Sequence, residues 1–234
     1  MQDFLAKKAA EHGISLSESQ LEQFERYAAL LIDWNMRMNL TAITDPKEIA
    51  VKHFLDSLIG AKHLGQAVTV CDVGSGAGFP GLPLKILRPD LRMTLMDSLN
   101  KRITFLNTVI DSLKLQNIAA VHIRAEDAGR SPLYREQFDM VVSRAVARLN
   151  TLCEYTLPLV RVGGHLLAYK GEASSEIKES CHAIQVLGGK IETIDTFSLS
   201  SDAENRTLIL IQKERSTPKQ YPRGKGKERS DPLF

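Results

Sequence analysis

A glycine-rich stretch from Asp72 to Gly81 carries the residue types best suited to binding a ligand. Glycines stand at positions 74, 76, 78 and 81, directly after the apolar run from Val68 to Val73. Because glycine has no Cβ, such a turn lets the backbone approach a ligand closely and adopt positive φ angles. Ligands of open α/β sheets bind at the carboxyl ends of the strands, which is where this turn lies. The stretch therefore predicts a binding site.

Two registers of these glycines are compatible with two kinds of cofactor. Gly76 to Gly81 spells G-x-G-x-x-G, so a nicotinamide-dependent oxidoreductase is one alternative. That register places Gly74 and Ser75 inside the end of the strand, where glycine is unfavourable. Read from Gly74, the pattern is acid-x-G-x-G-x-G with Asp72 as the acid, and it resembles the first motif of methyltransferases that use S-adenosylmethionine. We favour this second register.

Acidic residues follow the next two predicted strands. Asp97 ends the second strand roughly 20 residues past the glycines, where a carboxylate can accept hydrogen bonds from ribose hydroxyls. Dehydrogenases share this feature, so Asp97 indicates a nucleoside and not a particular cofactor; alternatively, it caps the next helix. Ala125, Glu126 and Asp127 follow the third strand, at a place that contacts adenine in methyltransferases.

Strands and helices that position these residues alternate between Val68 and Lys213. Strands are predicted at 68–73, 92–96, 119–124, 138–142, 165–169, 191–198 and 206–212, and helices at 82–87, 101–115, 151–160 and 174–187. Such alternation predicts right-handed crossovers and a mostly parallel sheet. The polar link from Ser200 to Asn205 favours a reversal between the last two strands. We therefore expect an α/β, Rossmann-like class I methyltransferase fold, with a seven-stranded, mostly parallel sheet and an antiparallel last strand.

Two regions flank this predicted domain. Residues 1–66 are predicted to form a helical extension, with a capping box at Ser17 and Gln20 and a second start at Asp45-Pro46. Residues 214–234 are rich in proline, glycine and charge, and we expect them to be extended or disordered when unbound. The expected division is thus a helical region at 1–66, the Rossmann-like domain at 67–213 and a basic tail at 214–234.

The composition excludes a membrane protein and a disulfide scaffold. The 234 residues are 43% hydrophobic and 25% charged, as in ordinary globular proteins. No apolar run approaches the ~20 residues that span a bilayer, and the first residues lack a signal core. The three cysteines, at 71, 153 and 181, lack metal-ligand spacing. We therefore expect a cytoplasmic protein with reduced thiols, no membrane contact and no metal site.

Positive charge is concentrated at the C-terminal end. From Lys213 onward there are seven basic and three acidic residues, and the rest of the chain carries 23 basic and 25 acidic residues. A basic tail on a near-neutral body is typical of a protein with a polyanionic partner, because lysines and arginines bind phosphates in a salt-dependent way. A solvated tail that only aids solubility is the alternative.

Several motifs in order resemble the bacterial small-subunit ribosomal RNA methyltransferase G family, once called glucose-inhibited division protein B. The resemblance extends from Trp34 to about Arg223. Its motifs are Trp34-Asn35, Asn39-Leu40-Thr41, Lys52-His53, Asp56-Ser57-Leu58, the glycine stretch 72–81, and residues 97–102, 124–126, 143–145 and 170–171. The resemblance implies transfer of a methyl group from S-adenosylmethionine to N7 of guanine 527, in the 530 loop of the 16S rRNA of the 30S subunit.

The resemblance also implies which residues bind the donor. They are Gly74, Phe79, Ala125, Glu126 and Arg144, and the arguments from the glycine turn and the ribose acid add Gly76 and Asp97. The tail segment 217–223 resembles the family as well. The segment from Gly224 to Arg229 departs from it, because it lacks the Gly-x-Pro-x-Lys pattern that the family leads us to expect.

Methylation at guanine N7 needs no general base, because its in-plane lone pair attacks without loss of a proton. We therefore predict no catalytic acid or base, and we expect alignment of N7 with the methyl group to dominate. Arg144 can stack on a base or contact phosphate, or else pair with Asp139 or Glu126. Lys170 can contact phosphate or lie on the surface. His53 is interpreted as a non-catalytic helix residue packed against Asp56.

Three functions are compatible with the sequence. An rRNA methyltransferase, expected to be a monomer, is favoured by the glycine stretch. A nicotinamide-dependent oxidoreductase shares the G-x-G-x-x-G spelling, and a non-enzymatic ribosome assembly factor would bind rRNA without binding the donor. Binding of S-adenosylmethionine distinguishes the first function from the other two.

Overall fold

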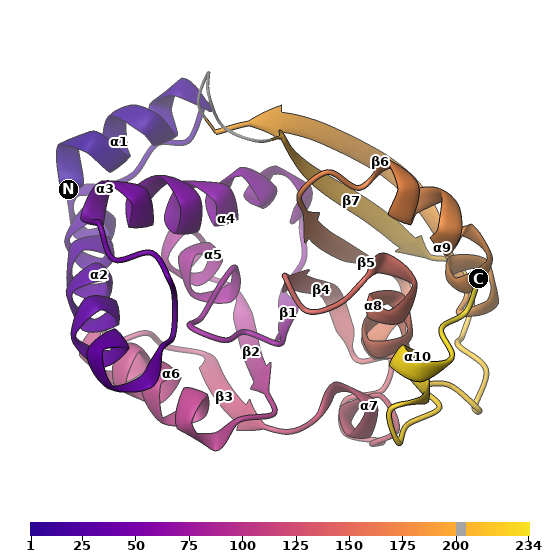
Figure 1. Ribbon diagram of the computed structural model, residues 1–234. Coiled ribbons are helices and arrows are strands. Elements are labelled where there is room, and N and C mark those ends of the chain that lie inside the picture. Colours follow the sequence, from indigo (N-terminus) through magenta and orange to yellow (C-terminus); the bar gives the residue numbers. More distant parts are fainter. Residues whose placement is uncertain (200–204) are drawn as a thin grey trace.

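A seven-stranded sheet forms the centre of the computed structural model, which describes residues 1–199 and 205–234 (Figure 1). The strands are β1 (Thr69–Val73), β2 (Arg92–Asp97), β3 (Ile118–His122), β4 (Phe138–Arg144), β5 (Val160–Lys170), β6 (Gly189–Ser198) and β7 (Asn205–Lys213). Their order is β3-β2-β1-β4-β5-β7-β6, and β7 runs antiparallel to both of its neighbours. The predicted fold is thereby confirmed. Most of the link predicted between the last two strands, residues 200–204, lies outside the described residues.

Helices cover both faces of the sheet because side chains of successive strand residues point to opposite sides. One face packs against α1 (Gln2–Glu11), α2 (Glu18–Met38), α5 (Gly81–Leu87) and α6 (Asn100–Ser112). The other packs against α7 (Ala125–Ala128), α8 (Leu149–Thr156) and α9 (Ser174–Val186). In β1, Val70 belongs to the first core and Cys71 to the second, so a single strand supports both layers.

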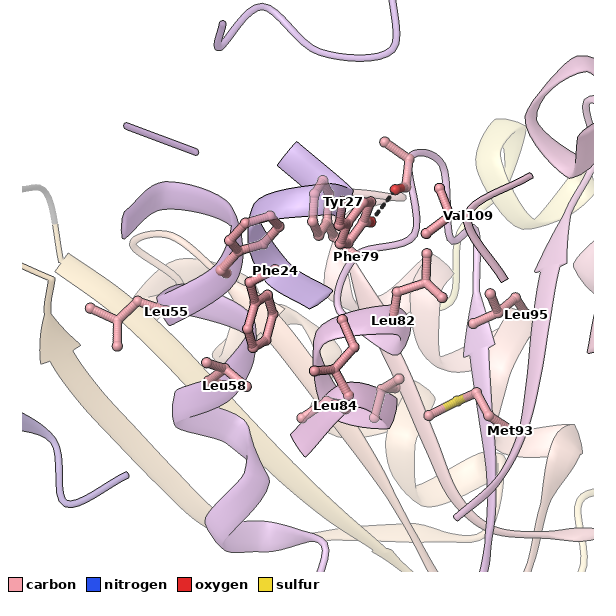
Figure 2. Close-up of a cluster of buried hydrophobic side chains, with 14 of the residues drawn as sticks. Phe24, Tyr27, Leu55, Leu58, Phe79, Leu82, Leu84, Met93, Leu95 and Val109 are labelled. Carbon is pink, nitrogen blue, oxygen red and sulfur yellow. Dashed lines mark hydrogen bonds between the residues drawn. The ribbon is translucent and has the colours of Figure 1, made fainter. Parts of the chain in front are cut away.

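The N-terminal helices belong to the main core. In α2, the capping box predicted at Ser17 and Gln20 is present, and Phe24, Tyr27 and Leu31 are fully buried. Tyr27 Oη donates a hydrogen bond of 2.5 Å to the carbonyl oxygen of Ala77, inside the glycine turn (Figure 2). The helical extension therefore supports the loop that the sequence singles out for ligand binding.

An irregular helix joins this extension to the sheet. It comprises α3 (Pro46–Glu48), a π-helical segment (Ile49–Leu55), α4 (Asp56–Ile59) and a 3-10 turn (Gly60–His63). Asp45 caps it, since its side chain accepts hydrogen bonds from the amides of Lys47 and Glu48. π-helical turns are rare and occur frequently at functional sites. This one places His53 just ahead of Asp56.

Residues 214–234 pack on the domain, largely without helix or strand, so of the two predicted states, extended or disordered, the disordered one is wrong. Arg135 donates hydrogen bonds to the carbonyl oxygens of Thr217 and Tyr221, at 2.7 and 2.8 Å. Arg223 pairs with Glu154, which is 1% exposed, at 2.8 Å. A short helix, α10 (Lys227–Ser230), follows. The tail is ordered because the domain supplies partners for its carbonyl groups and charges, and these partners are distant in sequence.

Candidate functional site

The glycine turn after β1 needs glycine at several positions. Gly74, Gly76 and Gly78 have φ angles of 73°, 59° and 97°. A Cβ built on Gly74 would lie 2.4 Å from Val146 Cγ2. The amides of Gly74 and Ser75 donate to the carbonyl oxygen of Met96 at 2.8 and 3.1 Å, which attaches the turn to the end of β2. Positive φ angles and this close packing together explain the alternation of glycines in the sequence.

Asp97 holds the same turn from the other side. Its carboxylate, 3% exposed, accepts hydrogen bonds of 2.9 Å from the amides of Gly76 and Leu99. Arg102 Nη1 lies 3.2 Å from Oδ2 of this carboxylate. The residue that caps α6 is Leu99, so the alternative in which Asp97 itself is the cap is wrong. The turn and a buried negative charge are therefore fixed to each other.

Asp72 lies beneath the turn and is fully buried. Its Oδ2 accepts a hydrogen bond of 2.9 Å from the amide of Gly81, and Oδ1 has no hydrogen-bond partner within the described residues. Burial raises the pKa of this carboxyl group to about 7, although the hydrogen bond from Gly81 acts in the opposite direction. Asp72 supports the start of α5 and does not face the cavity described next.

A cavity of about 390 Å³ lies at the carboxyl ends of β1 to β4, where an open α/β sheet binds its ligand. We call it the glycine-turn cavity. Among the predicted donor-binding residues, Gly74, Asp97, Ala125 and Glu126 line it. Gly76 contacts it only indirectly, through its hydrogen bond to Asp97. Phe79 and Arg144 do not line it, so the structure brings together four of these seven residues.

A second cavity, of about 440 Å³, adjoins the first, and we call it the charged cavity. The titratable side chains in its wall are Lys52, His53, Asp56, Arg144, Tyr169, Lys170, Glu176 and Arg206. Ala145, which has a positive φ of 58°, lines both cavities. Ala145 directly follows β4, so the two cavities lie on either side of one residue at the end of a central strand.

Arg144 and Asp56 form the centre of the charged cavity. Arg144 Nη1 lies 2.6 Å from Asp56 Oδ2, and the two side chains are 15% and 6% exposed. Arg206 Nε lies 3.7 Å from the other oxygen of Asp56. The arginine also lies over the ring of Phe79, 5.0 Å from its centroid. The pairing of Arg144 with Asp139 or Glu126, which the sequence left open, is wrong.

His53 is neutral at physiological pH. Its ring stacks on Phe79 with 4.5 Å between centroids, rather than against Asp56 as the sequence suggested. Burial, followed by the nearby charge of Arg144, lowers the pKa of this imidazole to about 4. Arg144 Nη2 lies 3.4 Å from Nδ1, so the neutral ring carries its proton on Nε2, which is 2.8 Å from Thr41 Oγ1. His53 therefore contacts both Phe79 and Arg144 and helps to position them.

Lys170 is engaged in contacts within the protein. Its ammonium donates 2.7 Å hydrogen bonds to Ala147 O and to the Glu176 carboxylate, and its side chain is 10% exposed. These contacts hold the loop that follows β4.

The described residues hold no cluster of side chains that could bind a metal ion, and none of their helices is long and apolar enough to cross a membrane.

Sequence reasoning missed several residues of the glycine-turn cavity, including Val146 in the loop after β4. Tyr155 on α8 and the tail residues Gly226 and Arg229 complete its wall. No local pattern signals them, because the tail is held at the cavity by partners distant in sequence, among them Arg135 and Glu154. Asp56 stood in a family motif, but nothing in the sequence indicated that it pairs with Arg144.

Comparisons with known proteins agree with this geometry. A family model described as rRNA small subunit methyltransferase G matches residues 20–208. A protein of Lachnoclostridium phytofermentans, named ribosomal RNA small subunit methyltransferase G, is 54% identical over 225 residues, which are 95% of this chain and 93% of that protein. Its namesake in Staphylococcus carnosus is 46% identical over 236 residues, covering 99% and 98% of the two chains.

The fold is also shared with solved structures. The crystal structure of M. jannaschii TYW2 in complex with AdoMet superposes with a TM-score of 0.53 at 13% identity. The match covers 68% of this chain and 76% of that one. At this identity the likeness shows the fold alone, and it agrees with the class I methyltransferase architecture predicted above.

Proposed function

The chain belongs to the rRNA small subunit methyltransferase G family, and on this premise we propose that it methylates N7 of guanine 527 in the 16S rRNA with S-adenosylmethionine as donor. The observation that carries the proposal is the junction of the two cavities at Ala145. A donor in one cavity and a base in the other can meet there. We further propose that the protein acts as a cytoplasmic monomer.

The glycine-turn cavity fits the donor. Asp97 presents a buried carboxylate that suits ribose hydroxyls, and Ala125 and Glu126 line the adjacent wall where adenine would lie. Gly74 lies directly against Val146, another residue of the cavity wall. A Cβ at position 74 would collide with Val146 and disturb this wall. When bound, S-adenosylmethionine supplies an electrophilic methyl group on a sulfonium. The turn and Asp97 would hold the adenosine half of that donor at the carboxyl ends of β1 and β2.

The charged cavity suits a guanine from a single-stranded loop. Sequence-specific RNA recognition mostly targets exposed bases, which stack on arginine or aromatic planes. The guanidinium of Arg144 is planar, and Asp56 and Phe79 hold it in place. Arg206 adds a second cation toward the phosphates. Lys170 stays with Ala147 and Glu176 and acts by fixing the loop between the cavities.

The protein contributes alignment and electrostatics to the reaction. N7 loses no proton, so the neutral His53 is not required as a base. Positive charge would move from sulfur to the guanine during transfer, and Asp56 and Glu176 are the acidic groups that line the charged cavity. Well-oriented reactants avoid much of the entropic cost of a bimolecular encounter, so this preorganisation accounts for most of the expected acceleration.

Mass mapping of rRNA tests the proposal. Purified protein is incubated with labelled donor and with 30S subunits or 16S rRNA that lack the modification. We expect one 7-methylguanosine, in the 530 loop. A label at any other position, or none with either substrate, contradicts it.

Melting temperatures separate the competing functions. S-adenosylmethionine should raise the melting temperature, because a ligand that binds only the folded state stabilises it, whereas NAD should not. The reverse result would indicate an oxidoreductase. An rRNA-binding protein that responds to neither cofactor would be an assembly factor.

A further inference from the structure

The tail contributes a wall of the glycine-turn cavity. Gly226 and Arg229 line this cavity together with Tyr155 and Glu126. In Figure 1 the yellow helix α10 lies beside α8, the helix that carries Tyr155. A segment that follows the last strand of the sheet thus returns to the carboxyl ends of its first strands.

Helix α8 holds this wall in place. Arg223 makes a two-pronged contact with Glu154, with Nε 3.0 Å from Oε1 and Nη2 2.8 Å from Oε2. Thr151 Oγ1 donates a hydrogen bond of 2.9 Å to the carbonyl oxygen of Glu228. These partners stand on the same helix as Tyr155. Two-pronged arginine–carboxylate contacts fix orientation as well as distance, so the tail is held in register with the cavity.

Two glycines turn the tail back toward the cavity. Gly224 and Gly226 have φ angles of 72° and 78°, which favour glycine. The fully buried Glu228 accepts a hydrogen bond from the amide of Gly224 and closes the turn. This segment, from Gly224 to Arg229, is where the sequence lacks the Gly-x-Pro-x-Lys pattern of the family.

The position of Arg229 indicates which part of a ligand it meets. The residues from Ile123 to Glu126, at the carboxyl end of β3, form the wall beside Asp97. Burial raises the pKa of the Tyr155 phenol, and the charges of Arg229, Glu228 and Glu126 modulate it, so these groups lie close together. With the ribose at Asp97, the base of a nucleoside extends toward this group. A guanidinium can stack on a purine or donate to its ring nitrogens.

We propose that Arg229 and Tyr155 bind the adenosine half of the methyl donor, which makes the tail a donor-binding element. This inference rests on the proposed function, because it takes the donor to occupy the glycine-turn cavity. The tail, residues 214–234, would then have two roles: its exposed lysines suit RNA binding, and Arg229 contacts the donor.

Calorimetry with two ligands tests the inference. S-Adenosylhomocysteine contains both halves of the donor, and 5′-methylthioadenosine lacks the amino-acid half. The variant is Arg229→Ala, and its matched control is Lys227→Ala, which removes an equal charge from an exposed site on the same short helix. We expect Arg229→Ala to weaken both ligands about tenfold, as loss of a charged hydrogen bond predicts, and Lys227→Ala to change neither.

The other outcomes are equally informative. Weakening of S-adenosylhomocysteine alone would show that Arg229 contacts the amino-acid half, and it would overturn the assignment. Unchanged binding of both ligands, with an unchanged melting temperature, would also overturn it. If the wild-type protein bound neither ligand, the proposed function itself would fail, so the two failures are distinguishable. Tyr155→Phe keeps the ring and serves as a second variant, with a smaller loss expected for both ligands.

Discussion

The two cavities that meet at Ala145 are built in different ways. Strand ends and a tight turn with the buried carboxylate of Asp97 form one side of the glycine-turn cavity, and α8 and the tail close another. The charged cavity is formed by side chains from separate elements, and its centre is the ion pair between Arg144 and Asp56. The glycine turn of the first cavity is fixed mainly by hydrogen bonds from its backbone amides, whereas the second cavity depends on contacts between side chains.

This difference matches the two kinds of ligand. A small cofactor of constant shape is best held by a rigid backbone, because little ordering remains to be done on binding. A nucleic acid brings its own charges, so its site needs cations that are already paired and can change partners. We therefore expect donor binding to depend on few residues and RNA binding to depend on many. Three variants test this contrast, and a fourth, at Asp72, tests the support beneath the glycine turn.

Asp72→Asn should produce the largest effect, on the pH dependence of stability. The folded pKa of about 7 exceeds the unfolded value of 3.8, so the native state binds more protons between these pH values. Stability from this group is complete below pH 4 and falls as the pH rises to 7, by at most about 4 kcal/mol. Denaturant unfolding of the wild type and the variant at pH 5 and pH 8 measures the difference. Identical pH dependence in both proteins would show that Asp72 is not the buried titrating group.

Asp97→Ala should weaken S-adenosylhomocysteine by about a hundredfold, because the turn loses its anchor and the ribose its acceptor. RNA affinity should stay within about twofold, as expected if the two cavities act separately. Calorimetry and filter binding measure the two quantities. Asp90→Ala, at an exposed acid paired with Arg88, is the control. An equal loss of RNA affinity would remove the distinction between the cavities.

Arg144→Ala should lower turnover about thirtyfold while donor affinity stays within about threefold, because Arg144 lines only the charged cavity. Removing one partner of a buried pair also costs stability, so the melting temperature must be checked. Arg161→Ala, which breaks the more exposed pair with Asp139, is the matched control. A large loss of donor affinity would instead support the donor-binding role that the family resemblance implies.

Replacing Lys225 and Lys227 by alanine should have the smallest effect. Both are exposed, so we expect about a threefold loss of RNA affinity at low salt and a shallower salt dependence, by roughly one to two units of slope. Filter binding over a salt series is the measurement. A change in donor affinity would mean that these lysines support the tail wall instead.

The sequence predicts those parts of the molecule whose signals are local. Each strand and the glycine turn has a signal within fewer than about ten neighbouring residues, and so does Asp97 at the end of β2. Periodicity and spacing are therefore enough to find them. The structure confirms the seven-stranded, mostly parallel sheet with an antiparallel last strand, and it places Gly74, Asp97, Ala125 and Glu126 around one cavity.

The parts that the sequence does not predict depend on contacts between distant segments. Arg144 meets Asp56 across 88 positions, and Arg223 meets Glu154 across 69. The tail has the composition of a disordered segment, and it is ordered because buried partners on the domain satisfy its polar groups. Tyr155 and Arg229 belong to the cavity for the same reason.

The hydrogen bond from Tyr27 to Ala77 couples the unfolding of α2 to that of the glycine turn. One hydrophobic core contains Phe24, Tyr27 and Leu31 of α2 together with strand residues such as Val70 and Met140. We therefore expect the regions on the two sides of residue 66 to unfold together. Unfolding of α2 would remove the hydrogen bond that supports the glycine turn. Proton exchange at the amides of Gly78 and Phe79 should therefore keep pace with exchange in that helix, and a shortened protein starting at residue 67 should lack an ordered cofactor loop.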